Sequence, residues 1–169
     1  LQWMRFAFFA TYREETSDIQ IANYLRVLAL GMIVFGILTA LAVWFHLVTQ
    51  NTAIAVYVIV TGLAAYDALH EAARTRLQAR TVAIGVITRS VLILLLGIAA
   101  LKFHATALAL ALAFGAAHWG GALALSHSVS GVLKAPWSKD AAATLWQSGR
   151  QLIPAFAVDS FGLQFDRLQ

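Results

Sequence analysis

A run of forty residues without one Asp, Glu, Lys or Arg, residues 27–66, constrains the fold of this chain more than any other feature. A helix that crosses the hydrocarbon core of a bilayer needs about 20 apolar residues, so the run is too long for a single crossing. The polar segment 46–52 (HLVTQNT) divides it. The run therefore predicts two membrane-spanning helices, at about residues 27–47 and 53–72, that form an antiparallel hairpin.

Composition points to the same environment. The chain has 169 residues, of which 60% are hydrophobic and 12% are charged. Soluble domains contain about 45–50% apolar and about 25% charged residues. A soluble domain of this size must expose much of its chain to water, so it has no place for so many apolar side chains. We therefore expect a lipid bilayer around this protein and an all-α, polytopic transmembrane bundle.

Two further spans follow in the sequence, at about residues 82–101 and 105–126. The second has a face of small residues that would let neighbouring helices approach closely, namely Ala109, Ala113, Ala116, Ala117 and Gly120. Residues 1–26 resemble the end of a preceding helix and a cytoplasmic junction. Residues 127–150 form a polar connection, and 151–169 resemble the start of another span. The chain begins at Leu1 and ends in an apolar segment, so we expect an internal piece of a longer protein, with four full spans and a partial helix at each end.

The distribution of basic residues predicts the orientation of these helices. Nine Lys and Arg residues lie on one side of the expected spans, and only Lys102 lies on the other. Cytoplasmic loops carry the excess of Lys and Arg, so both flanks and the middle loop are expected in the cytoplasm. The nine are Arg5, Arg13, Arg26, Arg74, Arg76, Arg80, Lys134, Lys139 and Arg150.

Motifs for soluble functions are missing from the sequence. The net charge of +4 arises from residues between apolar runs, so we expect no nucleic-acid partner. The chain has no cysteine, which excludes disulfides and thiolate chemistry. The helix motif of zinc proteases begins at His70-Glu71, but Arg74 occupies the position of the second histidine. We find no nucleophile elbow and no phosphate-binding loop, so we expect no enzyme activity, cofactor or metal.

Arg89 is the first candidate for a functional residue, because it lies inside the third predicted span. A charged side chain there costs about 2.5–3.5 kcal/mol on insertion scales, and such residues usually face a bundle interior or a wet cavity. The alternative is that its long side chain extends to the membrane surface. His118 is a second intramembrane polar residue, and a hydrogen-bonded structural role is favoured over proton relay. Trp44 and Tyr66 are expected to anchor span ends at the interface.

The last segment contributes three more charged candidates. Asp159 and Asp166 are seven residues apart and would share one face of a helix, with Arg167 adjacent to it. If residues 152–169 begin a span, this acidic face could pair with Arg89 or contact a cation. If the segment lies at the membrane surface, these charges need no partner.

Several segments resemble polysaccharide flippases, the Wzx-like (PST) branch of the multidrug/oligosaccharidyl-lipid/polysaccharide (MOP) exporter superfamily. Residues 4–15 (MRFAFFATYREE) look like the junction after the second helix of that family. Residues 62–74 (GLAAYDALHEAAR) resemble the end of its fourth helix. Residues 146–156 (WQSGRQLIPAF) and 165–168 (FDRL) resemble the start of its seventh helix. The resemblance covers nearly the whole chain, as helices three to six with flanking parts.

The resemblance implies a transporter of the bacterial inner membrane with two six-helix bundles around a central cavity. It would flip a lipid-linked oligosaccharide, or export polysaccharide, by alternating access. Arg89 or Arg167 would contact the anionic pyrophosphate head group, and Asp159 and Asp166 would bind a coupling cation or position the arginines. Two alternatives stay open: a membrane enzyme acting on lipid or isoprenoid phosphates, and a non-catalytic membrane assembly subunit.

Overall fold

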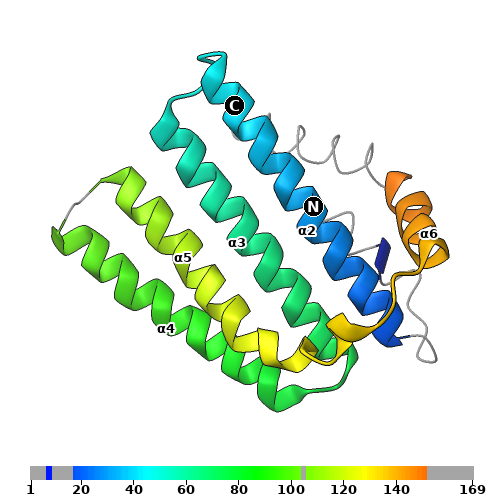
Figure 1. The fold of residues 1–169 in the computed structure, drawn as a ribbon. Helices are drawn as coiled ribbons and strands as arrows, with labels where there is room; N and C mark the ends of the chain where they lie inside the picture. The colour runs from blue at the N-terminus through cyan, green and yellow to red at the C-terminus, as the bar shows by residue number, and fades with distance from the viewer. Residues whose placement is uncertain (1–6, 9–16, 104–105, 152–169) are drawn as a thin grey trace, which may run out of the picture. The chain divides into compact units, whose positions relative to one another are not determined.

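The computed structural model of the chain describes residues 7–8, 17–103 and 106–151. Every regular element of appreciable length in these ranges is a helix, which confirms the all-α prediction (Figure 1). The elements are α2 (Ser17–Trp44), α3 (Gln50–Thr75), α4 (Ala79–Phe103), α5 (Ala107–Ser126), the short 3₁₀ helices η2 (His127–Val129) and η3 (Val132–Lys134), and α6 (Lys139–Arg150).

Four of these helices are long and apolar enough to cross a membrane, as predicted. They contain 28, 26, 25 and 23 residues when α5 is extended through Val129. Because an α-helix rises about 1.5 Å per residue, each exceeds the roughly 30 Å of a hydrocarbon core. The chain is therefore a multi-pass membrane protein.

α3 and α4 extend beyond the predicted spans at both ends and α2 extends at its start, whereas α5 begins two residues later than predicted. α2 begins at Ser17, ten residues before the expected span, and α3 continues to Thr75. Residues 67–75 (DALHEAART) are mostly good helix formers, so the helix continues past the end of the apolar run. Only residues 76–78 then separate α3 from α4. Hydropathy locates the part of a helix that suits lipid, whereas hydrogen bonding and propensity decide where the helix ends.

Side-chain caps define several helix starts. The Thr49 hydroxyl accepts a hydrogen bond from the Thr52 amide at 3.3 Å at the start of α3. The Thr106 hydroxyl accepts one from the Ala109 amide at 3.1 Å at the start of α5. Such caps satisfy amide groups that have no partner within the first turn of a helix.

The described residues belong to two compact units. Ala29–Leu133 form one unit, and Leu1–Leu28 with Lys134–Gln169 form the other, so α2 contributes to both. In the larger unit α3 and α5 lie side by side, and α4 packs on the other side of α5 (Figure 1). Within this unit, the buried core cluster contains Ala65, Tyr66, Ala73, Ala122 and Leu125.

Glycines bring α3 and α5 into close approach. A Cβ atom added to Gly62 would lie 2.7 Å from the Gly115 carbonyl oxygen. One added to Gly115 would lie 2.7 Å from Val58 Cγ1 and 2.9 Å from the Val58 carbonyl carbon. Small residues at such positions let two membrane helices pack backbone to backbone.

The face of small residues predicted on α5 lies mainly along α4. Ala109, Ala113 and Ala116 line one side of a shallow apolar groove, whose α4 side includes Leu96, Ala99 and Ala100. Further along the helix, Gly120 lies against Leu92. The two faces of α5 thus serve different neighbours.

The smaller unit joins the first part of α2 to the segment around α6. The Arg26 guanidinium donates a hydrogen bond from Nη2 to the Ala135 carbonyl at 2.7 Å. The Ser138 amide donates to Asn23 Oδ1 at 3.3 Å, and the Ser138 hydroxyl caps α6. In the same unit, the rings of Phe8 and Tyr24 stack with their centroids 4.8 Å apart. The hydrogen bonds of Arg26 and Asn23 attach the start of α6 to α2.

The turn between α3 and α4 contains a left-handed residue. Leu77 has a φ of 54° and its side chain is 90% exposed, so it occupies a strained conformation without packing in return. Replacing Leu77 with glycine is expected to raise the free energy of unfolding by about 1 kcal/mol, because glycine adopts positive φ without steric cost. Thermal unfolding in detergent measures the effect. Gln78→Gly is the control, and equal responses of the two variants would contradict the prediction.

Candidate intramembrane site

Arg89 lies in α4, ten residues after Ala79, which is about 15 Å from the start of that helix by helical rise. Its guanidinium carbon is 4.5 Å from the centroid of the Tyr66 ring in α3. This geometry is a cation–π contact, in which the negative face of the ring attracts the charge. Because Tyr66 belongs to the buried core cluster, the arginine head group lies against the bundle at this contact, although the residue as a whole is partly exposed.

Residues from three helices meet at this depth. Tyr66 precedes the end of α3 at Thr75 by nine residues, and His118 precedes the end of α5 at Ser126 by eight. Helical rise places both residues about 12–14 Å from these helix ends. Residues 76–78 join the end of α3 to the start of α4. The distances of Tyr66 and Arg89 from these two helix ends are therefore measured from the same side of the bundle.

Gly121 of α5 provides the space in which Arg89 and Tyr66 meet. A Cβ atom at Gly121 would lie 2.8 Å from Arg89 Cβ. It would also lie 2.9 Å from Tyr66 Cδ2 and 3.0 Å from Tyr66 Cε2. Any larger residue at 121 would have to displace the arginine, the tyrosine or both.

His118 of α5 packs against Tyr66 of α3. Its side chain is only 3% exposed, and its Nδ1 lies 2.8 Å from the Phe114 carbonyl oxygen. A carbonyl can only accept, so Nδ1 carries the proton of this hydrogen bond. The imidazole meets the Tyr66 ring edge-on, with centroids 5.8 Å apart. The prediction of a hydrogen-bonded histidine is confirmed.

The hydrogen bonding of Arg89 is incomplete within the described residues. Its Nε is buried and has no hydrogen-bond partner among residues 7–8, 17–103 and 106–151. A buried donor without an acceptor costs about 1–3 kcal/mol. The position therefore favours a group that brings oxygen acceptors and negative charge.

The interfacial role of Tyr66 stays a prediction, but the structure places its ring in the buried core cluster. The side chain is 3% exposed and packs beneath Arg89, because α3 continues nine residues beyond it and places it well inside the helix. Trp44, by contrast, is 77% exposed at the end of α2, as a membrane anchor would be. The aromatic signal in the sequence is the same for both residues, so it could not separate them.

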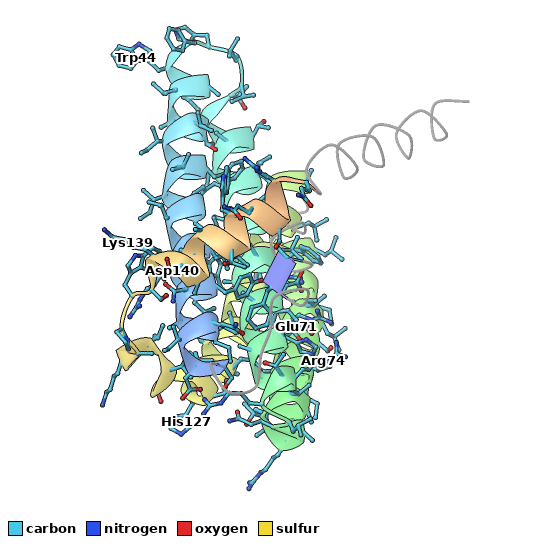
Figure 2. All side chains as sticks on the ribbon, turned by 90° about the vertical axis from the view of Figure 1, so that its right-hand side faces the viewer. Trp44, Glu71, Arg74, His127, Lys139 and Asp140 are labelled. Atoms are coloured by element: carbon cyan, nitrogen blue, oxygen red, sulfur yellow. The ribbon has the colours of Figure 1, made fainter. Side chains whose placement is uncertain are left out.

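The charged residues near the end of α3 form a local pair instead of a zinc motif. Glu71 is 1% exposed, and its Oε1 lies 3.5 Å from Nη1 of Arg74, which is largely exposed. Figure 2 shows both residues near the end of the helix bundle that also contains His127. The Arg76 guanidinium donates to the Ser128 carbonyl at 2.8 Å and connects the turn after α3 to η2.

The other predicted site residues, Asp159, Asp166 and Arg167, lie outside the described residues, so their pairing with Arg89 stays a prediction. Sequence reasoning did not select Tyr66 or Gly121 for this site. The described ranges contain no group of three His, Cys, Asp or Glu side chains placed to hold a metal ion. No protein-family model, no curated protein and no solved structure matches the chain.

Proposed function

We propose that this chain is part of an integral membrane transporter that flips lipid-linked oligosaccharide across the bacterial inner membrane by alternating access. Arg89 contacts the anionic head group of the substrate. The observation that carries the proposal is the buried Nε of Arg89, which has no acceptor among the described residues although it lies about 15 Å into α4.

An arginine at this depth suits an anionic substrate. Its insertion costs about 2.5–3.5 kcal/mol, and membrane proteins retain such residues mainly along substrate or ion pathways. A guanidinium presents N–H donors in one plane and binds two phosphate oxygens at once. A pyrophosphate head group supplies several such oxygens and carries the negative charge that the site favours.

The contact with Tyr66 suits transport rather than permanent binding. The Arg89 guanidinium carbon lies 4.5 Å from the centroid of the Tyr66 ring, and a ring offers no oxygen acceptor to the N–H donors of the arginine. A carboxylate partner at the same place would neutralise the charge and compete with the substrate. The tyrosine holds the arginine in the interior and leaves its positive charge in place for an incoming anion.

The sequence resemblance supports the substrate class. Helices three to six of a polysaccharide flippase would form part of one bundle beside the central cavity. In that arrangement Arg167 would be a second cationic contact, with Asp159 and Asp166 as partners of a coupling cation or of the arginines.

Flipping by the full-length protein tests the proposal. We expect Arg89→Gln to reduce the rate by about 10- to 100-fold, because a charge-assisted hydrogen bond contributes about 1.5–3 kcal/mol. Arg89→Lys should retain part of the activity, since an ammonium keeps the charge but loses the planar, two-point contact. The assay is restoration of surface polysaccharide in a strain that lacks the transporter, normalised to protein abundance in the membrane.

Arg80→Gln is the matched control, because Arg80 is an exposed arginine in the first turn of the same helix. It should flip at the wild-type rate. Undiminished flipping by Arg89→Gln would remove Arg89 from the substrate pathway and with it the proposal.

A further inference from the structure

One face of α6 carries basic and aromatic side chains in a continuous row. Residues 139, 143, 146 and 150 follow the i, i+4, i+7, i+11 spacing that places side chains on one side of a helix. We call Lys139, Ala143, Trp146 and Arg150 the basic–aromatic stripe, and all four are exposed. Leu145 and Gly149, on an adjacent flank of the helix, are buried.

The segment before α6 continues this chemistry. Lys134 and Trp137 are also exposed, and Trp137 and Trp146 expose 50% and 54% of their surface. In Figure 2, Lys139 projects away from the ribbon at the start of α6, beside Asp140. Asp140 is the single acidic residue of segment 132–150 against three basic ones, so the segment has a net charge of +2.

Hydrogen bonds attach this segment to a membrane-spanning helix. The Arg26 guanidinium donates to the Ala135 carbonyl at 2.7 Å, and the Ser138 amide donates to Asn23 Oδ1 at 3.3 Å. Both α2 residues precede the uncharged run that starts at residue 27. The start of α6 is therefore held at the end of α2 where the chain enters the bilayer.

We propose that the basic–aromatic stripe binds the anionic phospholipid head groups of the membrane that α2 crosses. Tryptophan rings favour the head-group region, where one part of the ring is apolar and the other is wet. Lys and Arg side chains next to them reach the phosphates while their methylene groups contact apolar surface. Anionic lipids attract such residues, and the effect falls with ionic strength. The inference does not depend on the proposed transport function.

A spin label on the stripe tests this binding. The chain has no cysteine, so Ala143→Cys places a single label between Lys139 and Trp146. The full chain is reconstituted in vesicles of phosphatidylcholine alone or mixed with phosphatidylglycerol. Collisions with apolar oxygen and with a water-soluble nickel chelate then report where residue 143 lies. We expect the oxygen collisions to dominate in the anionic vesicles.

Removing two of the positive charges gives a quantitative test of the same binding. The double variant Lys139→Gln/Arg150→Gln should lower the ratio of membrane-seated to detached α6 by about 25-fold in anionic vesicles, since each basic residue near the surface contributes about fivefold. Lys102→Gln is the control and should leave the ratio unchanged, because Lys102 lies in the last turn of α4 and is not part of the basic–aromatic stripe.

Three results would overturn the proposal. One is a label that stays accessible to the nickel chelate in anionic vesicles. Another is a seated label that responds neither to lipid charge nor to the double variant. The third is a label shielded from both collision reagents, which would assign the stripe to a protein partner instead.

Discussion

Replacing Gly115 with alanine is expected to lower the free energy of unfolding by about 1–3 kcal/mol, the range typical of overpacking in a close-packed core. The new methyl group would meet the Val58 carbonyl carbon at 2.9 Å and the Ile59 amide nitrogen at 3.0 Å. Both are backbone atoms of α3 and cannot rotate away as a side chain can. The two helices would have to separate along their contact.

Gly97→Ala is a matched control for this substitution. Gly97 is also inside a membrane-spanning helix, but a Cβ atom there would meet nothing within 4 Å. Alanine at that site should be neutral or stabilise the helix by about 0.5–1 kcal/mol through its propensity. Reversible unfolding of the two variants in mixed micelles, followed by far-ultraviolet circular dichroism, gives the comparison. Equal stability of both variants would mean that α3 and α5 do not pack through Gly115.

Arg89→Leu is expected to stabilise the protein while it abolishes transport. Leucine removes the buried Nε donor that has no partner among the described residues, which recovers about 1–3 kcal/mol. Losing the contact with Tyr66 forfeits about 1–2 kcal/mol. The central values of the two terms leave a net gain of about 0.5 kcal/mol in the free energy of unfolding. The loss of transport should be at least as large as for Arg89→Gln, because leucine offers no hydrogen bond to a phosphate.

The opposite signs of the two effects distinguish function from packing. Replacing a residue that serves only the packing of the bundle lowers the stability of the protein. Replacing a residue that serves only substrate binding does not. Arg80→Leu is the control for hydrophobicity alone. A fall in stability for Arg89→Leu would make the arginine a structural partner of Tyr66 and remove this support for a substrate-binding role.

The contact of Tyr66 with Arg89 could not be predicted from the sequence. Arg89 is conspicuous in the sequence because it is charged within an apolar run. Tyr66 is separated from it by 23 positions and lies on another helix, and its aromatic ring suggests an interfacial anchor equally well. Only the packing of α3 against α4 and α5 brings the ring beneath the guanidinium. A contact between helices depends on their rotation about their axes, which residue type does not report.

The close contacts made at Gly115 and Gly121 could not be predicted from the sequence either. The chain has eleven glycines, and α5 is apolar around its whole circumference. Periodicity therefore cannot tell which side of α5 meets α3 and which meets α4. The predicted face of small residues lies mainly against α4, while the close backbone contact to α3 is made by Gly115.

The sequence by itself determined the class of fold and the number of membrane helices, because the thickness of a bilayer sets how many apolar residues one crossing needs. It also singled out Arg89, since a charge among apolar residues is visible without coordinates. The tertiary structure alone decided which side chains surround that charge and which glycines bring α3 and α5 together. In a chain that is apolar on nearly every side, shape rather than hydropathy selects the contacting faces.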